Sequence, residues 1–307
     1  MKKRRRFGIK LLKFIFMILL FSFMYSIGVS TYENIKKNEK LEEFKSRAYE
    51  SETVTKFGDT YVYHKVARVH EWEIADDRDV FYDPVTRHYP GVEGDILLTF
   101  ESPFPYTPVI HQMLSFWLGG HAALVGKDNQ ILQSTGMTAN GLLDFSTMVN
   151  VVLHRGYDET NEYGVSIQKI TNYWMVPYRG VGHAEYPYYG KYYRPEIFAV
   201  RTKFRDQNTR QEHIDSAVDF IEDKVDRGLY NYLFIFDTQD KFYCTDLVTR
   251  AWAQVNTNSN PNYNLDKDGF IPSDYDILLS DDVYITIYKE TITNEDGNQE
   301  IHVYYLD

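Results

Sequence analysis

The chain has 307 residues, of which 43% are hydrophobic and 25% are charged, enough to bury the core of one large domain or two small ones. Its formal net charge is −11, yet seven of its 33 lysines and arginines lie in the first thirteen residues, where there is no acidic residue. The rest of the chain therefore sets 26 basic against 44 acidic side chains. Since nucleic-acid binding needs a basic surface, this composition excludes a nucleic-acid partner.

The N-terminus joins a basic cluster to an apolar stretch. Residues 2–6, 10 and 13 are basic, and residues 14–29 are apolar except for two serines and a glycine. With the preceding leucines this run approaches the roughly 20 residues that cross a bilayer. The basic flank should stay in the cytoplasm, so residues 1–30 are predicted to form a single-pass anchor with the remaining chain extracytoplasmic.

A cleaved signal peptide is the alternative interpretation of this stretch. Its cleavage would need small residues after the apolar run, and only the segment from Ser26 to Gly28 offers a weak site. A lipoprotein anchor is excluded, because it needs a cysteine immediately after the apolar run and none is there.

The next segment, residues 31–53, is charged and rich in helix formers, and we interpret it as a membrane-proximal stalk or helix. Residues 54–307 are then expected to form one extracytoplasmic domain. Its first strand-like pattern covers residues 61–69, and an acidic, proline-containing stretch over 75–91 is predicted to be a loop. That loop lacks the spacing of a calcium-binding loop, so a solvated loop is favoured over a calcium site.

Buried strands and one amphipathic helix follow. Residues 96–100 form a strand after the turn at Gly94 and Asp95, and residues 109–118 have helical spacing. Two apolar runs, 121–125 and 131–134, are joined by a short polar turn and predict an antiparallel hairpin.

The second half of the chain continues this mixture of strands and helices. A tyrosine- and proline-rich stretch, residues 186–193, is either a cleft wall for a sugar or an apolar chain, or a loop that packs its own rings. The Asp296-Gly297 pair predicts a hairpin. The other expected elements are strands at 165–170, 197–202, 283–288 and 301–305 and an amphipathic helix at 214–225.

The only cysteine, Cys244, lies where a helix begins, because apolar residues follow it at helical spacing from Leu247 to Val255. Unpaired backbone N–H groups and the helix dipole favour an anion at this position, so a thiolate would be stabilised. A lone cysteine together with a histidine elsewhere is a candidate nucleophile pair. The alternative is a small buried hydrophobic residue.

His121 is the candidate base, because it opens a buried strand directly after two glycines. If the hairpin turn is centred on residues 128–129, Gln133 pairs with His121 across the strands and can fix its tautomer by a hydrogen bond. His111 and His183 are weaker alternatives, since neither has a strand setting. Asp95 and Asp246 are expected to stabilise a turn and a helix N-terminus. The chain has neither a zinc signature nor a phosphate-binding loop, so no metal or cofactor is expected.

Four stretches in this order, 94–98, 120–125, 131–133 and 240–248, resemble the circularly permuted papain-like hydrolases of the NlpC superfamily, and most closely the YiiX-like branch. The resemblance runs in pieces from about residue 93 to residue 282. It implies an α+β fold, in which an antiparallel sheet carries the nucleophile helix, and in which the histidine precedes the cysteine along the chain.

The resemblance assigns Cys244 as the nucleophile, His121 as the general base and Gln133 as the third, polar residue of the site. Members of the family often have a glutamate or a histidine at that third position, and a neutral amide stabilises an imidazolium less. Tyr243 and the backbone N–H of Cys244 are candidate contributors to an oxyanion site.

These patterns together predict a membrane-anchored, extracytoplasmic cysteine hydrolase that cleaves an amide or ester through an acyl-enzyme. Cell-wall peptide is the first-choice substrate, and an N-acyl or lipid-linked amide or ester is the alternative. Two other classes stay open: a surface binding module with weak or no turnover, and a membrane-tethered structural or adhesion protein.

Overall fold

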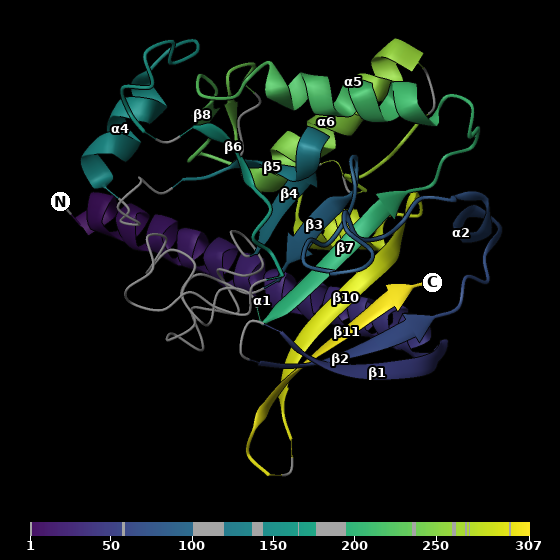
Figure 1. The fold of residues 1–307 in the computed structure, drawn as a ribbon. Coiled ribbons are helices and arrows are strands. Elements are labelled where there is room, and N and C mark those ends of the chain that lie inside the picture. The colour runs from purple at the N-terminus through teal and green to yellow at the C-terminus, as the bar shows by residue number, and fades with distance from the viewer. Residues whose placement is uncertain are drawn as a thin grey trace.

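A mostly antiparallel sheet forms the centre of the α+β fold (Figure 1). The structure of the protein is a computed structural model. Within the residues that the structure describes, this sheet has nine strands in the order β1-β2-β11-β10-β7-β3-β4-β5-β6, and β2 with β11 is its only parallel pair. The described residues are 2–56, 59–100, 120–136, 144–164, 166–175, 195–234, 238–259, 262–267, 269, 271–294 and 296–307.

Most of the expected strands and helices are present, with some shifted ends. The strands are β1 (Ala48–Lys56), β2 (Asp59–Val66), β3 (Ile96–Thr99), β4 (His121–Val125), β5 (Gln130–Ser134), β6 (Ile167–Thr171), β7 (Glu196–Thr202), β10 (Val283–Thr293) and β11 (Gln299–Leu306). A separate pair consists of β8 (Leu229–Tyr230) and β9 (Lys241–Phe242). The helices are α1 (Lys2–Ser46), α2 (Glu71–Ala75), α4 (Phe145–Leu153), α5 (Arg210–Glu222), α6 (Cys244–Ser259) and α7 (Asp274–Leu279), with a 3₁₀ turn at Lys127–Asn129.

The central strands read as continuous apolar runs because both of their faces are buried. Every residue of β3 and β4 is buried, and α6 packs against β4 and β5. Its buried face consists of the residues that the helical spacing predicted, Leu247, Val248, Ala251, Trp252 and Val255. In Figure 1, α5 and α6 lie together at one end of the sheet, as their mutual packing requires.

The hairpin of β4 and β5 is antiparallel as predicted, but its register differs from the expected one. Leu124 pairs with Leu132 and Val125 with Ile131. Continued along the strands, this register sets Gln133 opposite residue 123 rather than opposite His121. His121 and Gln133 are thus diagonal neighbours on one face of the hairpin, a separation that long side chains can bridge.

Helix α1 continues without a break from the apolar stretch into the domain. Its residues from Leu12 to Ser46 include a segment long and apolar enough to span a membrane. The residues expected to form a stalk, 31–53, are about the last third of this helix and most of β1. Leu41 and Phe44 are buried in the core, and β1 pairs with β2 along its length.

Polar contacts also fix α1 to the domain along several of its turns. The ammonium of Lys37 lies 3.0 Å from Glu196 on β7, and that of Lys45 lies 2.8 Å from Glu290 on β10. Between them, Lys40 donates to the backbone oxygen of Leu278 at the end of α7, at 2.7 Å. In Figure 1 the helix passes behind β7 and β10.

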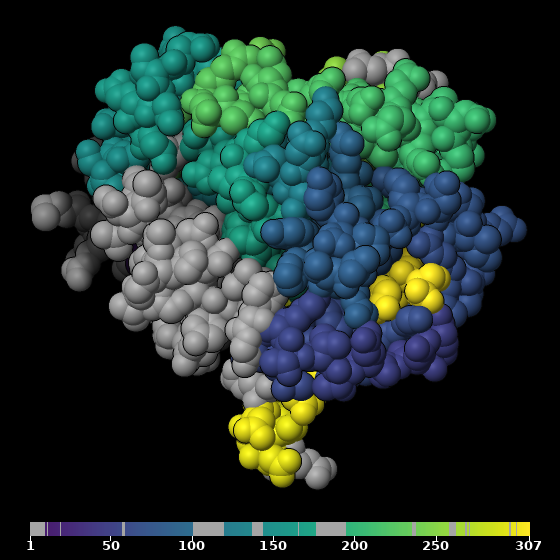
Figure 2. Space-filling view, viewed as in Figure 1, coloured from purple at the N-terminus to yellow at the C-terminus, as the bar shows by residue number. Residues whose placement is uncertain are grey.

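The hairpin of β10 and β11 confirms the turn predicted at Asp296-Gly297. Thr293 pairs with Gln299, and Gly297 has a φ of +82°, which suits glycine in a tight turn. The tip of this hairpin stands clear of the body of the molecule (Figure 2). The expected helix at 109–118 and the tyrosine-rich stretch 186–193 lie outside the described residues.

A buried charge cluster replaces part of the loop that was expected to be solvated. Arg201 on β7 is 1% exposed and donates to both oxygens of Asp95, at 2.7 and 2.9 Å. Asp76, also 1% exposed, accepts from Arg78 at 2.7 Å. Burial opposes the charge of Asp76, but the bond from Arg78 and the charge of Arg201 lower its pKa. Asp95 keeps its predicted turn role as well, by accepting from the N–H of Val92.

Truncating Phe44 to alanine should lower the free energy of unfolding by about 3–5 kcal/mol, because it leaves a cavity in the core. The matched control on the same helix is Ile35→Ala, since Ile35 is 52% exposed, and it should change that free energy by at most about 0.5 kcal/mol. Urea unfolding of chains that begin at Thr31 measures both. Equal decreases in the free energy of unfolding for the two variants would show that α1 does not belong to the folded domain.

Candidate functional site

Cys244 is the first residue of α6, where the sequence pattern placed it. Two hydrogen bonds fix the chain just before and just after Cys244. Ser134 on β5 donates to the backbone oxygen of Phe242 at 2.6 Å, and Thr245 donates to that of Pro272 at 2.6 Å. The start of α6 is therefore attached to the hairpin on one side and to the segment before α7 on the other. Cys244 itself is half-buried.

The thiol of Cys244 is surrounded by groups with opposing effects on its charge. Burial raises its pKa most, and the negative charge of Asp274 raises it further, to about 12. The backbone N–H groups of Ala122, Thr245 and Cys244 itself donate to the sulfur and lower the pKa, but by less. The helix start thus supplies the expected N–H groups, while burial outweighs the thiolate stabilisation that the sequence suggested.

His121 and Gln133 are joined by a short hydrogen bond. The distance between His121 Nε2 and Gln133 Oε1 is 2.8 Å, and both side chains are buried. An amide oxygen can only accept, so Nε2 carries the proton and Nδ1 is the basic nitrogen of the neutral ring. Ala122, whose N–H contacts the Cys244 sulfur, directly follows His121 in β4. The histidine strand and the cysteine helix therefore meet at this point.

Two aromatic residues that the sequence analysis did not single out complete the surroundings of the His121 ring. Trp174 stacks on it, with 5.9 Å between ring centroids and 17° between planes. Tyr173 donates from its hydroxyl to Gln133 Oε1 at 3.3 Å. Both residues follow β6, and nothing in their local sequence indicates a site. Only the pairing of β6 with β5 brings them to this histidine.

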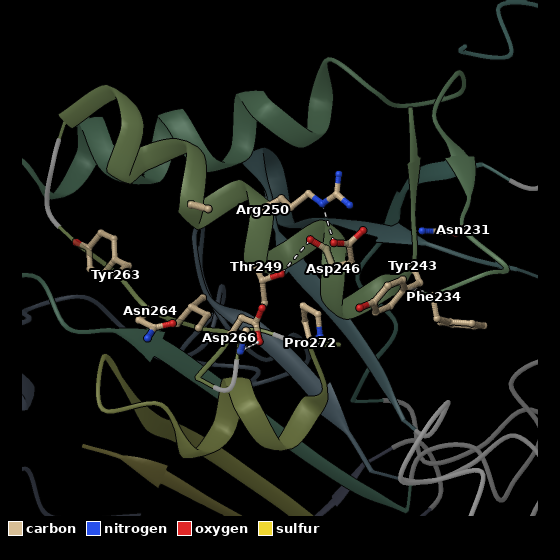
Figure 3. A pocket seen from close by; sticks show the side chains of 13 residues that line it. Asn231, Phe234, Tyr243, Asp246, Thr249, Arg250, Tyr263, Asn264, Asp266 and Pro272 are labelled. Atoms are coloured by element: carbon tan, nitrogen blue, oxygen red, sulfur yellow. Dashed lines mark hydrogen bonds and ion pairs between the residues drawn. The ribbon is translucent and has the colours of Figure 1, made fainter. Parts of the chain in front are cut away.

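Tyr243 lies on the other side of the helix start, beside a pocket of about 350 Å³ (Figure 3). Its ring is buried and contacts Phe234, at 5.1 Å between centroids. Asp246 accepts from Arg250 at 2.7 Å within the same pocket wall, in the first turn of α6, where an acidic residue was expected. The lining residues are Asn231, Phe234, Tyr243, Asp246, Thr249, Arg250, Ala253, Tyr263, Asn264, Leu265, Asp266, Gly269 and Pro272. The predicted site residues thus divide: Tyr243 faces this pocket, and Cys244, His121 and Gln133 lie outside its lining.

Gly120, which precedes His121, allows two segments to approach closely. Its φ is +85°, and a Cβ built there would lie 1.9 Å from Asp274 Oδ2 and 2.3 Å from the backbone oxygen of Thr99. Asp274, the first residue of α7, therefore packs directly on the backbone that leads into His121. Only glycine suits this position, both for its conformation and for its space.

The described residues contain no group of three His, Cys, Asp or Glu side chains that could hold a metal ion. The alternative histidines His111 and His183 lie outside the described residues, so they stay untested as candidates. The residues brought together in the described part of the chain are thus a thiol, an imidazole, an amide and a carboxyl group.

Gly120→Ala should destabilise the fold more than Gly156→Ala. Both glycines have a φ of +85°, so both variants bear a left-handed penalty of about 1–2 kcal/mol. Nothing lies within 4 Å of a Cβ at Gly156, whereas at Gly120 the collision with Asp274 and Thr99 adds about 1–3 kcal/mol. Urea unfolding of the two variants gives the difference, and equal losses would refute the close approach of α7.

Comparison of the chain with protein-family models, with curated proteins and with solved structures found no match. The α+β fold and the arrangement of the site therefore stand on the structure itself. The similarity to permuted papain-like hydrolases remains an expectation from the sequence.

Proposed function

We propose that the protein is a membrane-anchored cysteine hydrolase that acts outside the cytoplasm on an amide or ester bond. One observation carries the proposal: His121 is bonded to Gln133 at 2.8 Å, on a strand whose next N–H contacts the sulfur of Cys244. A nucleophile, a base and a residue that orients the base are the three parts that acyl transfer to a thiol requires. The permuted papain-like fold is part of this proposal.

The proposed first half-reaction uses the basic Nδ1 of His121. Nδ1 takes the thiol proton as the sulfur of Cys244 attacks the carbonyl carbon, and the carbonyl electron pair moves to the oxygen. The backbone N–H of Cys244 is the candidate donor to that oxyanion. The same role for the hydroxyl of Tyr243, which lines the neighbouring pocket, stays a prediction from the sequence. The carbonyl then re-forms, the bond to the leaving group breaks, and the imidazolium returns the proton to the departing amine or alcohol.

The second half-reaction restores the enzyme. His121 takes a proton from water, the resulting hydroxide adds to the thioester, and the sulfur of Cys244 leaves. The thiolate regains the proton from the imidazolium, and a carboxylic acid departs. A thiol whose pKa is about 12 is protonated at neutral pH, so proton removal by His121 must accompany the attack.

Cell-wall peptide is our first-choice substrate, because the basic flank and the apolar helix favour a domain at the outer surface. An N-acyl or lipid-linked amide or ester is the alternative, since the same acyl transfer applies to it. The pocket beside Tyr243 supports a second candidate function, a surface binding module. Its volume of about 350 Å³ lies within the usual range for ligand pockets, and its lining mixes aromatic, amide and charged groups.

Labelling by a thiol-directed acylating probe tests the hydrolase. The parent chain should label near neutral pH, Cys244→Ala should not label, and His121→Ala should label about 100-fold more slowly, because it lacks the base. His70→Ala is the histidine control, since the His70 side chain is 40% exposed and lies on another element, and it should label like the parent. Labelling of Cys244→Ala, or labelling of His121→Ala at the rate of the parent, would contradict the mechanism.

The single cysteine makes the proposed topology testable on whole cells. In a Cys244→Ala background, Val85→Cys places a thiol at a position that is 88% exposed, and a membrane-impermeant maleimide should label it on intact cells. Lys10→Cys, on the basic flank, should label only after lysis, because that flank is expected in the cytoplasm. The reverse pattern would overturn the extracytoplasmic location.

A further inference from the structure

The carboxyl group of Asp274 is buried, and the described part of the chain offers it no polar partner. The residue is 1% exposed, and neither of its two carboxyl oxygens has a hydrogen-bond partner among the residues that the structure describes. The close approach to Gly120 holds the group against the backbone just ahead of His121, with the carbonyl oxygen of Thr99 beside the same point. The neighbouring Asp276, in contrast, is fully engaged in capping α7 through Ser273.

An ionised carboxyl group does not suit this environment. A carboxylate only accepts hydrogen bonds, and burying it without donors costs several kcal/mol, whereas the protonated acid is neutral and can itself donate. Burial first, and the negative charge of Asp276 second, raise the pKa of Asp274 well above its ordinary value. The same packing that removes donors therefore keeps the proton on the group.

The charge of Asp274 matters because Asp274 and the thiol of Cys244 both lie at the start of β4, where Asp274 packs on Gly120 and the N–H of Ala122 donates to the sulfur. A negative Asp274 raises the pKa of that thiol. Two neighbouring acidic groups in a buried site do not lose their protons independently, since the first anion opposes the second. The thiolate therefore costs less free energy to form while Asp274 stays neutral than after Asp274 has ionised.

We propose that Asp274 is a positioning residue that works as a neutral carboxylic acid beside Cys244, and that its ionisation at high pH suppresses the nucleophile. This inference rests on the proposed function, in which Cys244 attacks the substrate. During the attack the thiol proton goes to His121 Nδ1, and Asp274 keeps its own proton throughout. The groups that face Asp274 are Asp276 and Tyr275 on α7, Cys244 on α6 and the backbone of Gly120 just before β4. Lys40 of α1 contacts the opposite end of α7.

The test is the rate at which iodoacetamide alkylates the full-length chain in detergent between pH 5 and pH 10. Cys244 is the only cysteine, so the signal belongs to one site. Asp274→Asn should match the parent within about twofold at pH 6, where both carry a neutral group. As pH rises and the parent's Asp274 ionises, Cys244 should be alkylated faster in the variant than in the parent. The ratio of the two rates should be about tenfold for each unit by which their thiol pKa values differ.

Asp281→Asn is the charge control, because the Asp281 side chain is 93% exposed, and its curve should overlay that of the parent. Curves for Asp274→Asn and the parent that coincide at every pH, or that differ by one constant factor, would overturn the proposal. Should Asp274→Asn fail to fold, the parent profile decides the question. The alkylation rate of the parent must fall below the curve for a single thiol ionisation at high pH. A rate profile that fits one ionisation would refute the inference.

This readout separates the inference from the proposed function, because alkylation requires no turnover. A protein that hydrolyses nothing can still show the pH-dependent gap between the two chains. An active hydrolase without that gap would leave the proposed function in place and remove the role of Asp274.

Discussion

The buried ion pair between Arg201 and Asp95 is the constraint on which the arrangement of the site depends. Arg201 belongs to β7 and Asp95 directly precedes β3. The ion pair therefore joins the start of β3 to the end of the antiparallel strand β7 beside it. β3 in turn pairs with β4, where Thr99 lies opposite His121. Removing Arg201 would leave the buried carboxylate of Asp95 without its ion-pair partner, at a cost of about 3–5 kcal/mol. The histidine therefore depends for its position on a charge pair at the far end of its neighbouring strand.

The sequence predicted the elements whose signals are local. The apolar face of α6, the β4–β5 hairpin and the C-terminal hairpin follow from periodicity and turn residues. β1 was not predicted, because its segment is polar and mostly exposed, and only its pairing with β2 makes it a strand. The parallel pairing of β2 with β11 joins residues more than 200 positions apart, which no local pattern reveals.

The site was predictable to the same extent. Cys244 and His121 carry local signals, a helix start and a strand start, and their elements do meet. The direct pairing of His121 with Gln133 was wrong by two residues, because the strand pairing is centred on Asp128 in the 3₁₀ turn, and a pairing centred there sets Gln133 opposite residue 123. Asp274 and Trp174 have no local signal, because their relation to the site arises only from packing. For the same reason the raised pKa of the thiol was missed, since burial depends on tertiary structure.

Because α1 is unbroken, it sets the distance between its apolar stretch and the folded domain. Its apolar stretch ends at Val29, and five residues later Asn34 accepts a hydrogen bond from the hydroxyl of Tyr275 in the domain, at 2.9 Å. At about 1.5 Å per residue, only some 8 Å of helix separates the two points. An inserted α1 would thus hold the domain at a fixed, short height above the bilayer and would prevent it from swinging outward.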